Sequence, residues 1–139
     1  ESGEDIRFIA RRIMICASED VGNADPEALI LAVNASLAVE RVGMPEAQII
    51  LTQAACYVAT AKKSNAAVKA IFAANEVVRK RGNLEIPSYL RDAHYSGHEK
   101  LGRGIGYKYP HDYPGHFVEQ QYLPEEIKDY RFYEEDFKK

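Results

Sequence analysis

The fold is decided by residues 26–61, PEALILAVNASLAVERVGMPEAQIILTQAACYVATA. The dipeptide Pro-Glu occurs twice in this stretch, and proline followed by a carboxylate is favoured in the first turn of a helix. Asp25 stands directly before the first pair as a candidate N-cap, and Gly43 separates the two halves. The stretch therefore predicts two consecutive helices, over about 26–42 and about 45–61.

Two further helices are expected, one on each side of this pair. Upstream, isoleucines recur at intervals of three and four residues, and this amphipathic pattern ends at Gly22. Downstream, Ser64 is placed to cap a helix that closes at Gly82. The predicted fold class is therefore all-α, with residues 1–82 forming a bundle of four main helices.

The two central helices are apolar on nearly every side, unlike the helices that flank them. A helix that is apolar all round must be buried all round, and the other elements of a chain of 139 residues cover two such helices with difficulty. Alanine recurs along both helices, which lets helix backbones approach closely. Two interpretations remain open: a tightly packed core within one chain, or an interface with another subunit.

Residues 83–139 differ in composition from the rest of the chain. They contain eight of the nine tyrosines, all four histidines and four of the six prolines. So many aromatic residues are atypical of a disordered tail, and we expect an irregular Tyr/Pro/Gly-rich strap that wraps the helical body within the same single domain. The strap is expected to contain a helical turn at 88–92, a short β-hairpin between 107–109 and 117–121, and a last short helix from Pro124.

The charge balance excludes some classes of function. The chain has 18 basic and 21 acidic residues, a net charge of −3, and a sequence pI of about 5.8. These values do not fit a domain whose main role is to bind phosphates through a broad basic face. No uncharged run reaches the roughly 20 residues needed to cross a bilayer, so no membrane span is expected.

The N-terminus and the two cysteines bear on the processing and the cellular location of the chain. It begins with Glu1 and no basic-then-apolar leader follows, so we expect a processed chain or a fragment of a longer protein. Cys16 and Cys56 fall within apolar helical patterns, where a buried reduced thiol is the expected state. Reduced thiols fit a cytoplasmic location.

No catalytic or cofactor-binding constellation is predicted. The glycine cluster Gly102–Gly106 lacks the Gly-Lys-Ser/Thr ending of a phosphate-binding loop and is interpreted as a turn. A metal site formed by His94, His98, His111 and His116 would make the chain a small metal-dependent enzyme, which is kept as a remote alternative. Proline and glycine interrupt both histidine pairs, so structural or solvent-facing histidines are expected instead.

Two basic pairs are the candidate contacts for DNA or a partner protein. They are Arg11 with Arg12 and Lys62 with Lys63, which an assembly would present in several copies. A third cluster, 79–81, lies at a predicted helix C-terminus, where cations interact favourably with the helix dipole.

Several short motifs together resemble the C-terminal region of the RarA/MgsA family, the replication-associated recombination AAA+ ATPases related to the Werner-helicase-interacting protein. The resemblance covers essentially the whole chain. The motifs are Ile9-Ala10-Arg11-Arg12, Ala17-Ser18-Glu19-Asp20-Val21-Gly22, Ala24-Asp25-Pro26, Met44-Pro45-Glu46, Lys63-Ser64-Asn65, Tyr107-Lys108-Tyr109-Pro110-His111-Asp112-Tyr113-Pro114 and Gln121-Tyr122-Leu123-Pro124.

The resemblance implies a clamp-loader-like parent ATPase that acts in DNA replication, recombination and repair at stalled forks. Its helical C-terminal part would resemble a clamp-loader collar and hold subunits in a homotetramer. ATP and Mg²⁺ would bind in an ATPase domain upstream of this chain, and DNA and replication proteins would be partners of the whole protein at the nucleoid. The alternative is a DNA-binding or partner-binding module of the same ATPase.

Overall fold

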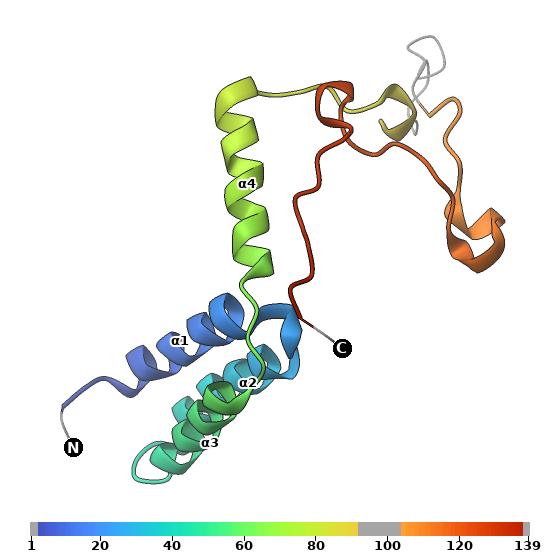
Figure 1. Cartoon of the computed structure of the whole chain (residues 1–139). Coiled ribbons are helices and arrows are strands. Elements are labelled where there is room, and N and C mark those ends of the chain that lie inside the picture. Colours follow the sequence, from blue (N-terminus) through green and yellow to red (C-terminus); the bar gives the residue numbers. More distant parts are fainter. Residues whose placement is uncertain (1–2, 92–103, 138–139) are drawn as a thin grey trace. The chain divides into compact units, whose positions relative to one another are not determined.

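A computed structural model describes residues 3–91 and 104–137, and the described part is all-α (Figure 1). The α-helices in it are α1 Ile6–Cys16, α2 Glu27–Val42, α3 Ala47–Thr60 and α4 Ala66–Arg81. Short turns connect and follow them, and no strand occurs in these residues. The predicted fold class and the four predicted helices are confirmed.

Helices α1, α2 and α3 pack against one another around a core made largely of alanine. Two clusters of buried side chains join the three helices, and small side chains at these contacts let the backbones approach closely. Several of the alanines that recur along α2 and α3 therefore serve the core of the single chain, whereas Ala55 and Ala59 are exposed. The fully or almost fully buried alanines of the three helices are Ala10, Ala28, Ala32, Ala35, Ala47 and Ala54.

The connection from α1 to α2 requires glycine. After α1 the chain forms a π-helical turn, Ala17–Val21, and then reaches Gly22 with a φ of 53°. A Cβ atom at Gly22 would lie 2.8 Å from the carbonyl oxygen of Ser64, closer than side chains tolerate. The predicted stop at Gly22 is confirmed, although regular α-helix ends at Cys16.

The start of α2 differs from the prediction. Asp25 was expected to cap this helix, but no side chain caps it. The Asp25 carboxylate instead accepts hydrogen bonds from the hydroxyl of Tyr57 in α3, at 3.1 and 3.3 Å. This contact raises the pKa of Tyr57, because the carboxylate stabilises the protonated hydroxyl. The Asp25 carboxylate is therefore bound to Tyr57 in α3 and does not cap α2.

The start of α4 holds the C-terminal segment. The Ser64 hydroxyl accepts a hydrogen bond from the backbone N–H of Ala66 at 3.2 Å, which confirms the predicted cap. The same hydroxyl donates to the carboxylate of Asp136, which also forms an ion pair with Lys69 at 3.4 Å. Nearby, Asn23 donates to the hydroxyl of Tyr133 at 3.1 Å.

The chain accordingly divides into two compact units. The first combines Glu1–Asn75 with Phe132–Lys139, and the second is Glu76–Arg131. We call them the helical unit and the inserted unit. The predicted division at residue 82 and the wrapping of the strap on the helical body stay predictions.

The inserted unit begins with residues 76–81 of α4 and continues in its described part as single turns, namely Ser88–Leu90, Pro110–Asp112, Pro114–His116 and Glu125–Ile127. The first turn was predicted, and the last replaces the predicted short helix with one 3₁₀ turn.

The predicted β-hairpin is not formed, because residues 107–109 and 117–121 are not paired as strands. The side-chain amide of Gln120 bonds instead to both backbone groups of Lys108, accepting from its N–H at 2.8 Å and donating to its C=O at 3.4 Å. The Gln120 side chain thus makes the hydrogen bonds to Lys108 that a paired strand was expected to make.

Candidate subunit interface

Helix α2 carries an exposed apolar face, which we call the α2 outer face: Leu29, Ile30, Val33 and Leu37. At about 100° per residue, these four side chains fall within an arc of about 100° on the helix. Ile30 and Leu37 remain 53% and 52% exposed. Exposed leucine and isoleucine at this density form a surface that favours burial against another protein.

The opposite side of α2 is already used by the core. Ala28, Ala32, Ala35 and Val39 are buried there. Apolar residues on the outer face are therefore additional to those needed to pack the single chain. Apolar side chains thus lie on both sides of α2, in line with the prediction that this helix is apolar on nearly every side. The single-chain core covers one of these sides and leaves the α2 outer face exposed.

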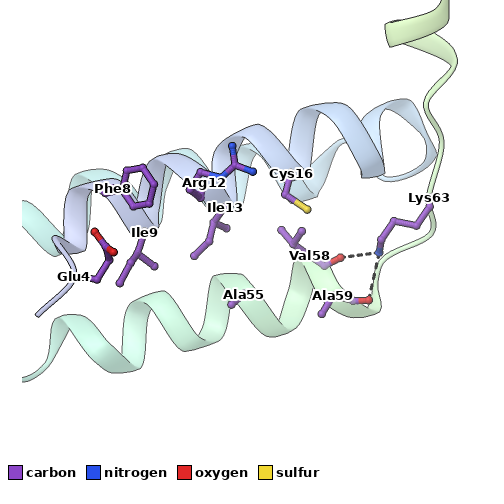
Figure 2. Close-up of a pocket in the computed structure, with 10 residues that line it drawn as sticks. All are labelled: Glu4, Phe8, Ile9, Arg12, Ile13, Cys16, Ala55, Val58, Ala59 and Lys63. Carbon is purple, nitrogen blue, oxygen red and sulfur yellow. Dashed lines mark hydrogen bonds between the residues drawn. The ribbon is translucent and has the colours of Figure 1, made fainter. Parts of the chain in front are cut away.

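A second apolar surface is the groove between α1 and α3, with a volume of about 460 Å³. Figure 2 shows Ile9 and Ile13 pointing from α1 toward α3, with Glu4 at one end of the groove and Lys63 at the other. Its floor and walls are mostly aliphatic, which suits an apolar side chain rather than a charged ligand. The remaining lining residues are Phe8, Arg12, Cys16, Ala55, Val58 and Ala59.

The two cysteines are free, as predicted, but they differ in burial. Cys16 is partly buried at the groove, and its thiol donates a hydrogen bond to Asp20 at 3.0 Å. That hydrogen bond, together with burial, raises the pKa of Cys16, so the thiol form is favoured. Cys56 is exposed on α3, so the prediction that it is buried is wrong. An apolar pattern on all sides does not indicate which side faces the core.

The candidate basic residues do not share one environment. Arg11 lies on α1 with its guanidinium 5.3 Å from the centre of the Phe8 ring, while Arg12 lines the groove. Lys63 also lines the groove, and Lys62 is exposed. A role of these four residues in binding DNA or a partner stays a prediction.

Lys63 has a structural role that the sequence analysis missed. Its ammonium donates to the carbonyl oxygens of Val58, Ala59 and Ala61, at 2.7, 3.3 and 2.6 Å. The carbonyls of Val58 and Ala59 lie in the last turn of α3, where backbone acceptors have no partner within the helix, and Ala61 directly follows that turn. Lys63 therefore caps α3, and three bonds already satisfy its donors. The only sequence signal is a lysine just past the end of a predicted helix.

The histidines divide into two pairs. His94 and His98 lie outside the described residues, as do Gly102 and Arg103 of the glycine cluster. His111 and His116 are brought together, with their ring centres 4.9 Å apart. Within residues 3–91 and 104–137, no group of three or more histidine, cysteine or acidic side chains is arranged to hold a metal ion.

Comparison with known proteins identifies the class. A family model described as MgsA AAA+ ATPase C terminal matches residues 1–139. The chain is 52% identical over 133 residues to an uncharacterized AAA domain-containing protein of Mycobacterium tuberculosis, covering 95% of this chain and 29% of that protein. It is 46% identical over 129 residues to replication-associated recombination protein A of Bacillus subtilis, covering 93% of this chain and 31% of that protein.

The chain is also similar to a eukaryotic protein over nearly its whole length. The chain is 40% identical over 135 residues to the ATPase WRNIP1 of Dictyostelium discoideum, covering 96% of this chain and 15% of that protein. The chain thus spans less than a third of the length of these relatives. Its class is the C-terminal region of AAA+ ATPases linked by name to replication-associated recombination. The chain belongs to the MgsA AAA+ ATPase C-terminal family.

None of the helices in the described residues is both long and apolar enough to span a bilayer.

Proposed function

We propose that this chain is a self-association domain that holds the subunits of a RarA/MgsA-type AAA+ ATPase together as a homotetramer. The observation that carries the proposal is the α2 outer face, an apolar surface that remains exposed although the same helix has already packed its core side. Homo-oligomers commonly bury such surfaces against a second copy.

Burying the α2 outer face is expected to contribute enough free energy to support association of subunits. Full burial of a leucine or isoleucine side chain contributes about 1.5–3 kcal/mol, so covering side chains that are half exposed contributes about 1 kcal/mol each. The α2 outer face supplies four such side chains from each copy. Their sum is several kcal/mol, which is needed to offset the entropy lost on association.

The names of the relatives suggest the cellular process in which the whole protein acts. Proteins named for replication-associated recombination share this C-terminal region, and we infer that the whole protein acts in the replication, recombination and repair of DNA. ATP and Mg²⁺ would bind in another part of the longer protein, and DNA and replication proteins would be its partners in the cytoplasm, at the nucleoid. This chain would hold the subunits together, and ATP would be hydrolysed in the other part of the protein.

Sedimentation across a concentration series tests the proposal. Four copies of a chain of 15.6 kDa have a mass of about 62 kDa, and the native chain should approach this value as concentration rises. The double variant Ile30→Glu/Leu37→Glu should remain at the mass of one chain, because association would bury two charges in each copy. A native chain that stays monomeric at all concentrations contradicts the proposal.

A matched control separates the α2 outer face from exposed apolar surface in general. Val78 in α4 is 56% exposed, similar to Ile30 and Leu37. Val78→Glu makes the same kind of change outside the proposed interface and should leave the association unchanged. Dissociation by Val78→Glu but not by the α2 variant would assign the interface to α4 instead.

A further inference from the structure

Two adjacent turns of the inserted unit bring a pair of imidazoles together. His111 lies in the turn Pro110–Asp112, and His116 ends the turn Pro114–His116. Their Nδ1 atoms are 3.3 Å apart, and both side chains are exposed. The proline that opens each turn fixes its own φ, which restricts the backbone that positions the two rings.

His116 occupies an unusual backbone conformation. It has a φ of 56°, and within the described residues it is the one residue other than glycine with a positive φ. The preceding Gly115 also has a positive φ, of 69°. Such a conformation is uncommon for a residue with a side chain. Here it turns the His116 ring toward His111, 4.9 Å away between ring centres.

The separation of the two nitrogens matches a specific coordination geometry. Zinc binds imidazole nitrogen at about 2.0–2.1 Å with tetrahedral angles, which places two nitrogen ligands about 3.3–3.4 Å apart. The observed Nδ1 to Nδ1 distance is 3.3 Å. Neutral imidazole is also a ligand type that borderline divalent metals prefer.

We infer that His111 and His116 form a two-histidine chelate for Zn²⁺ or a similar divalent transition metal. Both Nδ1 atoms bind the ion, and each ring keeps its proton on Nε2. Because the rings are exposed, water completes the coordination shell. The site departs from the sequence prediction of no metal site, and it is independent of the proposed self-association. Without metal, one Nδ1–H donates to the other Nδ1.

A Zn²⁺ titration of the untagged chain, followed by NMR of the histidine ring protons, tests this site. The His111 and His116 resonances should shift together, at the same Zn²⁺ concentration and with one ion per chain. Lower pH should weaken binding, because a protonated imidazole has no lone pair for the metal. Rings that respond at different Zn²⁺ concentrations, or not at all, would indicate an imidazole–imidazole hydrogen bond only and overturn the proposal.

Two variants remove one ligand each. His111→Gln removes the first imidazole, and His116→Asn removes the second while keeping a residue that tolerates positive φ. In either variant, the Zn²⁺ concentration that half-saturates the remaining ring should rise about tenfold or more, because the second donor no longer acts at high effective concentration. An unchanged midpoint contradicts a chelate, provided that circular dichroism shows the native helix content.

The other two histidines provide the control. His94→Gln/His98→Gln leaves the proposed chelate intact and should bind Zn²⁺ at the native midpoint. If this variant loses the response of His111 and His116 while the single variants keep it, the metal binds elsewhere and the assignment fails.

Discussion

The two units of this chain are stabilised in different ways. Of the buried apolar side chains in the described residues, every one but Ile127 lies in the helical unit. The inserted unit instead uses side chains that bond to backbone groups, as when the hydroxyl of Tyr89 donates to the carbonyl oxygen of Gln121 at 2.5 Å. One unit therefore depends on tight packing and the other on individual polar contacts, so each should respond to a different kind of substitution.

The largest expected effect comes from placing a charge in the alanine core. Ala32 is 1% exposed, and Ala32→Asp should destabilise the helical unit by about 3–5 kcal/mol because the carboxylate would have no partner. Urea unfolding followed by circular dichroism measures the loss. The control Ala73→Asp, at an exposed position of α4, should lose only about 0.7 kcal/mol from helix propensity. Equal losses would contradict a packed alanine core.

The next effect concerns the turn after α1. Gly22→Ala places a Cβ 2.8 Å from the Ser64 carbonyl oxygen at a positive φ, and should cost about 2–3 kcal/mol. Gly82 has a similar φ of 70° and open space around it, so Gly82→Ala should cost about 1 kcal/mol. The difference between the two variants in thermal unfolding reports the clash together with the backbone strain of Gly22, whose ψ is −137°. Equal losses of stability in the two variants would contradict a specific cost from the close approach of Ser64 to Gly22.

A smaller effect is expected at the cap of α4. Ser64→Ala removes the hydroxyl that bonds to Ala66 and Asp136, and loss of the cap alone should cost about 1 kcal/mol. Hydrogen exchange should also accelerate around Tyr133, because the C-terminal segment loses one of its attachments. Ser18→Ala, at an exposed position in the turn after α1, is the control. Unchanged exchange near Tyr133 would mean that Ser64 does not hold this segment.

In the inserted unit we expect a local loss. Gln120→Ala removes both bonds to the backbone of Lys108 and should cost about 0.5–1 kcal/mol. Amide exchange at Lys108 should rise while the helical unit is unchanged. Gln53→Ala, on the exposed side of α3, should leave Lys108 unaffected. A global loss of stability after Gln120→Ala would show that the two units do not unfold separately.

The smallest effect is a pH dependence at the C-terminal segment. The hydrogen bond from Ser64, and then the contact with Lys69, lower the pKa of Asp136 below its ordinary value of 3.8. The folded state therefore favours the carboxylate. This contribution is complete above about pH 4 and is lost as pH falls through the lowered pKa. Exchange near Tyr133 should accelerate in that acidic range in the native chain, and Asp136→Asn should remove this dependence.

The comparison also explains what the sequence could predict. Helix boundaries follow from local signals such as Pro-Glu pairs, Gly43 and the serine cap at Ser64, and these agree with the structure. Asp25 was predicted as a cap because caps are local, but Tyr57, 32 residues away, binds its carboxylate.

For the candidate sites, too, contacts between residues far apart in the sequence could not be predicted from local signals. The apolar composition of the central helices left open a single-chain core or a subunit interface, and it did not indicate which side of α2 stays exposed. The prediction of a hairpin was wrong, because nothing in the sequence indicates that the side chain of Gln120 binds the backbone of Lys108 where strand pairing was expected. Nothing in the local pattern of Asp136 indicates Ser64, which lies 72 residues earlier.

That last contact gives the chain a discontinuous organisation. Since the chain leaves the helical unit at residue 75 and rejoins it at 132, residues 76–131 form an excursion whose two ends are both anchored in the same unit. The entropy of closing such a loop rises only slowly with its length, by about 0.6 kcal/mol for each doubling. Lengthening this excursion beyond the end of α4 should therefore cost the helical unit little stability.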